Sequence, residues 1–343
     1  MRNIGLFIGS LGKGGAERVM SILANSLSVD ANVTMYLMSE RESVYELDTS
    51  VKVVYLRKEG LFNEFIYILK SLKNIDIAIA FTTKINVLVL LSSLLRIKRR
   101  IIVSERTART NKNVPYIWRR LRLLYWFSDC LVLPSEADVS YFNRFVRNIC
   151  VIPNGNNMRW KSLENRSNVI LMVGRLERVK NHIDILKIVT QNKKKFLDKF
   201  WRVIIYGEGS LSSEISCYIE SNSLENIVAV KPFVTDVQSV YHDSKIFVLP
   251  SLNEGYPNTL CEALVSGCAC LSYDIETGPA EIINHEENGI LIEAGRSDLM
   301  ESSLLDLMNS NKLLYHYNNG ARKVSENFTT KKMLEAWKEL VIK

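Results

Sequence analysis

The 343-residue chain has few of the residues that build metal sites, and those it has are scattered. It contains four histidines and six cysteines, and no Asp-x-Asp pair. Cys268 and Cys270 alternate with apolar residues and have no histidine nearby, so we expect a strand there rather than a metal site. These absences argue against a metal-dependent clamp for phosphate groups. The cysteines are typical of buried free thiols in a reducing compartment.

The chain also lacks a long hydrophobic run. The longest apolar stretch, Ile85–Leu95, is interrupted by Asn86 and two serines and is too short to cross a bilayer. Residues 1–8 are too short for the apolar core of a signal peptide and lead directly into a glycine-rich loop. No aromatic RNA-binding motif or helix-turn-helix pattern is present, which argues against nucleic acid as a partner. We therefore expect a cytoplasmic protein.

Positive charge is unevenly distributed. The net charge is +7, and the excess is concentrated in one run with a single acid, Glu105. A solvated basic surface would explain this run, but we favour an anionic membrane surface or a phosphorylated substrate. The basic residues of the run are Arg96, Lys98, Arg99, Arg100, Arg106, Arg109, Lys112, Arg119, Arg120 and Arg122.

Short apolar runs alternate with amphipathic helical patterns, which predicts parallel sheets with helices on their faces. A polar, turn-rich segment after Pro153 separates two such halves, so we place a domain boundary near residue 160. The expected strands are 4–8, 32–38, 51–56, 75–80, 100–104, 130–133, 149–152, 169–173, 201–206, 227–233, 245–249, 269–273 and 289–292. The expected helices are 19–27, 61–72, 85–97, 114–126, 137–146, 183–189, 237–242, two that begin near 258 and 279, and the remainder of the chain.

Glycine-rich turns follow two of the expected strands. Gly14 and Gly15 lie between the strand 4–8 and a helix, and Gly207 follows the strand 201–206. Such turns place backbone N–H groups at a helix N-terminus, where they can bind phosphate. Glycine also lets the backbone approach a ligand closely.

The segment 248–267 combines a strand end, a loop and a helix start. Asn258 is a plausible N-cap, and Glu254 and Glu262 lie on either side of this helix start. The glutamate content alone gives roughly two pairs at this spacing by chance, so the context at a strand's carboxyl end carries the argument. An anion site between two hydroxyl-binding carboxylates matches the ribose, diphosphate and sugar of a nucleotide sugar.

Two cations follow the strand 169–173 directly. Arg175 can hold a phosphate through two parallel hydrogen bonds, and Lys180 adds a point charge. Together they could neutralise the charge that develops on a departing diphosphate. The alternative is that Arg175 and Lys180 are ordinary surface residues of a loop, but their position at a strand end favours a role in phosphate binding.

Together these motifs resemble those of GT-B-fold retaining glycosyltransferases of family 4, over nearly the whole chain. The resemblance implies an α/β fold with two Rossmann-like domains that face each other across a cleft. Residues 1–160 would bind the acceptor, residues 161–327 would bind the nucleotide sugar, and a C-terminal helix in 328–343 would cross back to the first domain. The motifs are Gly14-Gly15-Ala16-Glu17, Ile152-Pro153-Asn154-Gly155, Gly174-Arg175 with Lys180-Asn181, Gly207-Glu208-Gly209, Pro250-Ser251 and Glu254-Gly255 with Glu262-Ala263.

The resemblance also implies roles for individual residues. Glu254, Arg175 and Lys180 would be catalytic: the two cations would hold the diphosphate and Glu254 would contact the donor sugar. Glu262 would contact the ribose. The reaction would retain the configuration at the sugar carbon without a metal or other cofactor, the leaving phosphate taking the acceptor's proton. The donor-binding residues would be Gly14, Gly15, Arg175, Lys180, Gly207, Val234, Glu254, Gly255, Tyr256, Asn258, Thr259 and Glu262.

Within this family the chain looks most like transferases of O-antigen, capsule or exopolysaccharide synthesis. The donor would be a nucleotide sugar, with a UDP-sugar favoured, and the transferred group a hexose or N-acetylhexosamine. The acceptor would be a polyprenyl-diphosphate-linked saccharide, bound by Glu105, Arg106 and Arg109 at the inner face of the cell membrane. Many members carry histidine where Arg106 stands, and a subgroup resembles this Ser-Glu-Arg pattern.

Two other functions remain open at this point. A non-enzymatic, membrane-peripheral scaffold would need degenerate loops, yet Arg175, Lys180, Glu254 and Glu262 are all intact. An NAD-dependent epimerase or dehydrogenase leaves the second α/β half unexplained. It would account for Gly9-x-x-Gly12-x-x-Gly15, for Glu40 at the end of the second strand and for the pair Tyr241-x-x-x-Lys245.

Overall fold

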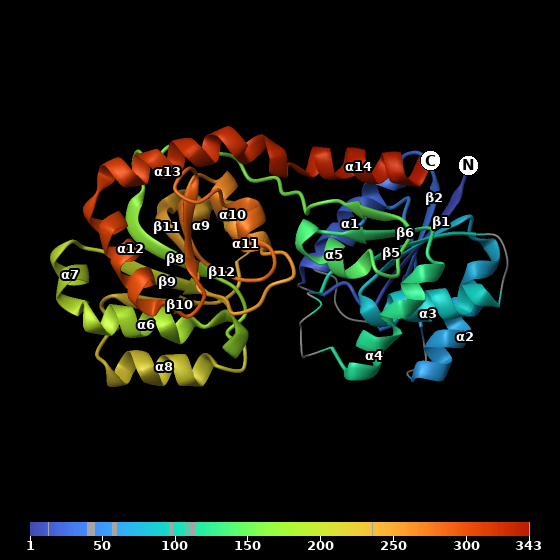
Figure 1. Ribbon diagram of the computed structural model, residues 1–343, viewed down its shortest axis with the longest axis horizontal. Helices are drawn as coiled ribbons and strands as arrows, with labels where there is room; N and C mark the ends of the chain where they lie inside the picture. Colours follow the sequence, from blue (N-terminus) through green and yellow to red (C-terminus); the bar gives the residue numbers. More distant parts are fainter. Residues whose placement is uncertain are drawn as a thin grey trace. The chain divides into compact units, whose positions relative to one another are not determined.

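The computed structural model describes residues 1–12, 14–39, 45–56, 60–95, 99–107, 109, 114–234 and 236–342. The chain forms two compact units (Figure 1). The first contains Met1–Gly155 and Thr330–Lys343, and the second contains Asn156–Thr329. The chain thus leaves the first unit at Gly155 and returns to it at Thr330, where the sequence suggested residues 160 and 328.

The first unit is built on a seven-stranded parallel sheet in the order β3-β2-β1-β4-β5-β6-β7. The strand order reverses between β1 and β4. In open α/β sheets ligands bind at the carboxyl ends of the strands beside such a switch point. The strands are β1 Asn3–Ile8, β2 Asn32–Leu37, β3 Lys52–Tyr55, β4 Ile77–Phe81, β5 Arg100–Ser104, β6 Cys130–Leu133 and β7 Ile149–Val151.

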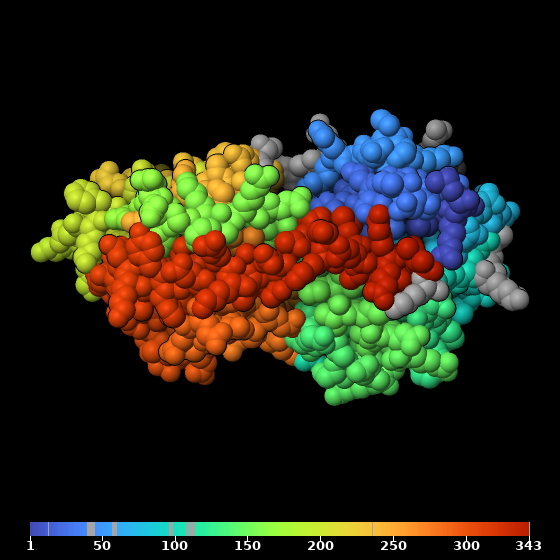
Figure 2. All heavy atoms as spheres, turned by 90° about the horizontal axis from the view of Figure 1, so that it is seen from above, coloured from blue at the N-terminus to red at the C-terminus, as the bar shows by residue number. Residues whose placement is uncertain are grey.

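Helices cover both faces of this sheet, so its central strands are apolar on both sides. Leu6 and Ile8 pack in one core together with Trp337 of the last helix, whereas Phe7 packs in the core on the opposite face. Arg2 donates to the carbonyls of Val341 and Ile342, so the two chain ends lie side by side (Figure 2). The helices are α1 Gly15–Leu27, α2 Leu61–Ser71, α3 Thr83–Leu94, α4 Tyr116–Leu121, α5 Val139–Phe142 and α14 Thr330–Ile342.

The second unit contains a six-stranded parallel sheet in the order β10-β9-β8-β11-β12-β13, with its switch point between β8 and β11. The strands are β8 Ser167–Val173, β9 Arg202–Tyr206, β10 Val228–Lys231, β11 Ser244–Leu249, β12 Ala269–Asp274 and β13 Gly289–Glu293. The helices are α6 His182–Gln191, α7 Lys193–Asp198, α8 Ser212–Ser221, α9 Val237–Asp243, α10 Asn258–Val265, α11 Pro279–Ile282, α12 Ser297–Asn309 and α13 Asn311–Val324.

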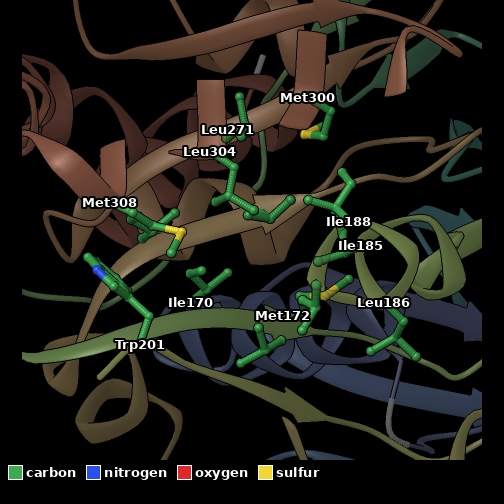
Figure 3. Close-up of a cluster of buried hydrophobic side chains, with 14 of the residues drawn as sticks. Ile170, Met172, Ile185, Leu186, Ile188, Trp201, Leu271, Met300, Leu304 and Met308 are labelled. Carbon is green, nitrogen blue, oxygen red and sulfur yellow. The ribbon is translucent and has the colours of Figure 1, made fainter. Parts of the chain in front are cut away.

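The larger core of this unit lies under α6, α8 and α12 (Figure 3). Ile170 and Met172 of β8 point into it and meet Ile185 and Ile188 of α6 and Leu304 of α12. The neighbouring residues Val169 and Leu171 belong to the core under α9 and α10. This alternation is the two-residue period of a strand that is covered on both faces.

The predicted α/β fold with two parallel sheets is therefore confirmed, while some predicted elements differ. The helix expected at 114–126 is α4 followed by a 3-10 segment, Arg122–Phe127, and α5 is shorter than expected. Asn258 is the first residue of α10 rather than its N-cap, which is Pro257. The sequence did not reveal α8, because only Ile215 and Ile219 are buried in it and the apolar period is correspondingly weak.

Candidate active site

The carboxyl ends of β8 and β11 bring two of the predicted residues together. Lys180 ends a short 3-10 turn after β8, and its Nζ lies 2.5 Å from Oε1 of Glu254, in the loop after β11. Their side chains are only 15% and 11% exposed. The N–H of Leu252 donates to the carbonyl of Val179 at 2.8 Å, so backbone and side chains both join these loops. The pair thus stands at the switch point of the sheet.

Arg175 does not take part in this pair. Its side chain is 71% exposed, and its Nη1 lies 2.8 Å from Oε1 of Glu177. The sequence grouped Arg175 with Lys180 because both follow β8. In the structure the arginine instead lies on the solvent side of the loop, where its charge is available at low desolvation cost.

The predicted glycine loop after β9 has a clear packing role. A Cβ at Gly207 would lie 1.9 Å from the carbonyl oxygen of Gly174, and one at Gly209 would lie 2.5 Å from that of Leu176. The amide of Gly207 donates to the carbonyl of Lys231 at 3.0 Å. Glycine is therefore required here so that the loops after β8 and β9 can touch.

The second predicted carboxylate is buried in α10. Glu262 is 5% exposed and accepts a hydrogen bond from the Tyr241 hydroxyl at 3.0 Å. Tyr256, in the loop before α10, is 8% exposed and its hydroxyl lies 4.0 Å from Sγ of Cys261. The dehydrogenase hypothesis pairs Tyr241 with Lys245, but the Tyr241 hydroxyl instead donates to Glu262.

The rest of the predicted donor set surrounds the start of α10. Asn258 and Thr259 form its first turn, where the N–H of Asn258 donates to the Tyr256 carbonyl and that of Leu260 to the Pro257 carbonyl, both at 3.0 Å. Gly255 belongs to the preceding loop, which is held by the loop after β12, because the Thr277 hydroxyl donates to the Glu254 carbonyl. Val234 follows β10, two strands away from β8 in the sheet. Lys245 donates to Asn168 at 2.7 Å, and Glu40 lies outside the described residues.

Sequence reasoning missed one residue of this site, His182. It begins α6 directly after Asn181, is 3% exposed, and its Nδ1 has no hydrogen-bond partner among the described residues. Burial, assisted by the nearby charge of Lys180, lowers the pKa of His182 from 6.5 to about 4. The imidazole is therefore neutral at physiological pH. Its position next to the Lys180-Asn181 motif was the available signal.

In the first unit, the predicted glycines lie at the carboxyl end of β1, beside its switch point. Gly14 is the N-cap of α1 and Gly15 is the first helical residue. The Gly14 carbonyl accepts from the Tyr45 hydroxyl at 3.2 Å and from the N–H of Arg18 at 3.1 Å. A Cβ at Gly14 would lie 2.1 Å from Oε2 of Glu17, so a side chain there would have to displace that carboxylate.

Glu105, predicted to bind the acceptor, has its carboxylate enclosed by donors of the first unit. It is 1% exposed and accepts hydrogen bonds from Arg122 at 3.1 Å and from the Tyr125 hydroxyl at 2.8 Å. Thr83 donates to it as well, and so does the backbone N–H of Arg106. Burial and the charge of Glu105 raise the pKa of Tyr125 well above its usual value. Glu105 is thus a buried residue that positions the loop after β5.

Arg106 and Arg109 follow Glu105 in that loop. Nη1 of Arg106 donates to Oδ1 of Asn154 at 2.5 Å, and its guanidinium lies 4.5 Å from the ring centre of Phe81. Its Nε and Nη2 are buried with no hydrogen-bond partner among the described residues. Burial lowers the pKa of Arg106 to about 9, although Glu105 opposes the shift. Arg109 forms an ion pair with Asp138 at 3.3 Å.

A strained residue lies beneath this loop. Thr82, the N-cap of α3 at the carboxyl end of β4, has φ of 76° and ψ of 146°. A β-branched residue rarely adopts a positive φ, and such strain is concentrated at functional sites. Thr82 therefore joins Arg106 as a candidate of the first unit, and composition or periodicity gave no signal for it.

Within the described residues, no group of three or more His, Cys, Asp or Glu side chains is placed to hold a metal ion. A search of the described helices likewise finds none with the length and apolarity needed to cross a membrane.

The comparisons with known proteins agree with this geometry. The model of the family described as Glycosyl transferases group 1 matches residues 155–324. The GalNAc-alpha-(1->4)-GalNAc-alpha-(1->3)-diNAcBac-PP-undecaprenol alpha-1,4-N-acetyl-D-galactosaminyltransferase of Campylobacter jejuni is 26% identical over 99% of this chain and 98% of its own length. The amylovoran biosynthesis glycosyltransferase AmsD of Erwinia amylovora is 26% identical over 98% of both chains.

Solved structures agree on the fold. Anabaena HepE, crystallised with UDP and glucose, superposes with a TM-score of 0.83 at 17% identity, and the match covers 99% of each chain. Two parallel sheets with flanking helices are the fold that this chain shares with such GT-B structures. The chain is therefore a glycosyltransferase with the GT-B fold, and its residues 155–324 match the family described as Glycosyl transferases group 1.

Proposed function

We propose that the chain is a metal-independent, retaining glycosyltransferase that acts on a polyprenyl-diphosphate-linked saccharide in O-antigen, capsule or exopolysaccharide synthesis. It takes a hexose or N-acetylhexosamine from a nucleotide sugar, with a UDP-sugar favoured. The observation that carries the proposal is the Lys180–Glu254 pair at the switch point of the second sheet. Relatives named for undecaprenol-linked acceptors, and a fold neighbour crystallised with UDP and glucose, support this choice of substrates.

The donor would be held by the loops after β8 and β11 together with α10. Its diphosphate takes Lys180 as a counter-ion, with Arg175 recruited from the solvent side, and lies at the N-terminus of α10. This frees the Glu254 carboxylate to accept hydrogen bonds from the sugar hydroxyls. Glu262, already placed by Tyr241, accepts from the ribose.

The transfer step follows from this placement. The acceptor hydroxyl oxygen forms a bond to the anomeric carbon, and the bond from that carbon to the β-phosphate oxygen breaks on the same face. The hydroxyl proton passes to the leaving phosphate oxygen, so no protein base is needed. Lys180 and Arg175 stabilise the charge on the diphosphate as it departs. Attack and departure on one face retain the configuration of the sugar.

In the first unit, Arg106 would serve the acceptor. Its guanidinium is held by Phe81 and Asn154 but makes no ion pair or hydrogen bond to a carboxylate among the described residues. A buried cation in this state is costly, and an anion such as the acceptor's diphosphate would compensate its charge. Arg109 supplies a second, partly exposed cation. Glu105 acts indirectly, because it holds the backbone of this loop.

The first test is a thermal-shift panel with UDP, GDP and NAD, each with and without EDTA. We expect UDP to raise the melting temperature and EDTA to leave the shift unchanged. Stabilisation by GDP instead would change the donor class, and stabilisation by NAD alone would favour the dehydrogenase. Loss of the UDP shift in EDTA would contradict metal independence, and no response to any ligand would favour the scaffold.

A second test addresses the stereochemistry. The product formed from a UDP-sugar and a short-chain polyprenyl diphosphate saccharide is analysed by NMR at the new anomeric centre. We expect the α or β configuration of the donor to be kept. Inversion would contradict the front-face step.

A further inference from the structure

The first unit carries an exposed apolar stripe on α4 and the 3-10 segment that follows it. Trp118, Leu121 and Leu124 face inward and pack against the core of the unit. Residues about three positions apart lie on the opposite face, and most of them are apolar. This face consists of Ile117, Leu123, Trp126 and Phe127, which are 58%, 58%, 46% and 51% exposed.

The neighbouring helices also carry exposed apolar residues. Leu94 and Leu95, at the end of α3, are 50% and 66% exposed, and Leu61 and Phe62, at the start of α2, are 54% and 75% exposed. The Ser92 hydroxyl donates to the Phe65 carbonyl at 3.5 Å, and α3 contacts α2 and α4. We call these eight residues the apolar surface. Its size is unusual, because soluble proteins rarely expose clustered large apolar side chains without a partner.

Aromatic rings and arginines are combined around the stripe. The guanidinium groups of Arg119 and Arg120 lie 5.8 and 5.7 Å from the ring centre of Tyr116, and Nη1 of Arg120 donates to the Tyr116 hydroxyl at 3.2 Å. Arg147 lies 4.4 Å from the ring centre of Trp126. None of these three arginines forms an ion pair with another described residue. Their charges are therefore available to an anionic partner.

The structure thereby revises the basic run seen in the sequence. Arg122 is buried, Arg106 is partly buried against Phe81 and Asn154, and Arg109 pairs with Asp138. Arg99 and Arg100 donate to backbone carbonyls. Arg96, Lys98 and Lys112 lie outside the described residues. Among the described basic residues of the run, only Arg119 and Arg120 accompany the stripe.

We propose that the apolar surface docks on a bilayer containing anionic phospholipid, with residues 116–127 lying in the interfacial layer. Isoleucine, leucine and phenylalanine enter the acyl boundary, tyrosine and tryptophan lie at the headgroup level, and arginine binds lipid phosphate. The positive charge beside an apolar stripe selects this partner over a neutral apolar one. The inference deepens the proposed function, because a polyprenyl-linked acceptor lies in a membrane, and it rests on that choice of acceptor.

The test is sedimentation of the full chain with vesicles of phosphatidylglycerol and phosphatidylethanolamine. The stripe variant carries Ile117→Ser, Leu123→Ser and Trp126→Ser, and the control carries Val29→Ser, Leu299→Ser and Tyr315→Ser, which are exposed elsewhere. We expect the stripe variant to lose about 10- to 100-fold in its partition coefficient and the control less than about twofold. Equal binding by the two variants would overturn the proposal.

Two further measurements test the role of the arginine charges and the depth to which the stripe inserts into the bilayer. Arg119→Glu with Arg120→Glu should weaken binding to anionic vesicles, and wild-type binding should keep a salt-resistant fraction from apolar insertion. Brominated lipids should quench the fluorescence of the wild type more than that of Trp126→Phe. Equal quenching, or complete loss of binding in salt, would refute insertion of the stripe.

Two outcomes separate this inference from its alternatives. If the wild type does not bind vesicles and sediments as a dimer, while the stripe variant sediments as a monomer, a second copy of the chain covers the surface and the proposal fails. If the stripe variant loses vesicle binding but no variant or wild type transfers sugar to a water-soluble acceptor, the surface stands and the proposed function fails.

Discussion

Nζ of Lys180 lies 2.5 Å from Oε1 of Glu254, and this contact joins two loops that are 74 residues apart in the sequence. Both side chains are largely shielded from water, so each charge depends on the other. A bound diphosphate would compete for the lysine and release the carboxylate toward the sugar. The pair can thus keep Glu254 in place until the donor arrives.

Replacing the carboxylate should affect turnover more than nucleotide binding. For Glu254→Gln we expect transfer to fall on the order of 100-fold, because a contact to the reacting sugar is weakened, while UDP affinity changes less than about threefold. Steady-state transfer and calorimetric titration of UDP measure the two effects. The control is Glu293→Gln, whose side chain is 78% exposed. Unchanged transfer in Glu254→Gln would remove this residue from the site.

Replacing the lysine should affect the nucleoside diphosphate directly. Lys180→Met should weaken UDP binding about tenfold or more, because a shielded counter-ion is lost. It should also lower the melting temperature, since Glu254 would be left as an unpaired, mostly buried charge. The double variant Lys180→Met/Glu254→Gln should recover part of that loss. Lys187→Met, at an exposed position of α6, is the control, and equal UDP affinity in Lys180→Met and this control would rule out the clamp.

The buried pair Glu105–Arg122 should be a major determinant of stability in the first unit. Both side chains are 1% exposed. Arg122→Met leaves the carboxylate uncompensated, so we expect a loss of about 3–5 kcal/mol in the free energy of unfolding. Arg120→Met, on the exposed side of the same helical segment, should change it by less than about 0.5 kcal/mol. Urea denaturation compares them, and similar midpoints would contradict the buried-pair interpretation.

His182 should make stability depend on pH. Its pKa is about 4 in the folded chain against 6.5 ordinarily, because burial disfavours the charged imidazole. Between these values the unfolded chain binds the proton and the folded chain does not, so stability falls as the pH drops through this window. The loss is at most about 3 kcal/mol. In His182→Leu this contribution is absent.

The measurement is the difference in melting temperature between about pH 7.5 and about pH 5. That difference should be smaller in His182→Leu than in the wild type, whereas His316→Leu, whose imidazole is exposed, should match the wild type. If His182→Leu keeps the full wild-type difference, His182 is not the group responsible.

Local patterns in the amino-acid sequence specify the alternation of strands and helices and the loops that contain the site residues. Apolar runs, helical periods and glycine-rich turns are local signals, and they placed Lys180, Glu254 and Glu262 after the strands where the structure has them. The parallel arrangement followed as well, because most strands lead through a helix to the next.

Which of these residues meet, and which charges are buried, depends on the tertiary structure. Lys180 binds Glu254 because β8 and β11 become neighbours in the sheet, a choice that no local pattern records. Glu105 and Arg122 look like surface charges in the sequence, yet they neutralise each other in the core. The strain at Thr82 and the exposed stripe on α4 likewise depend on what packs against each segment. Burial depends on contacts between residues distant in the chain, and composition and period do not specify it.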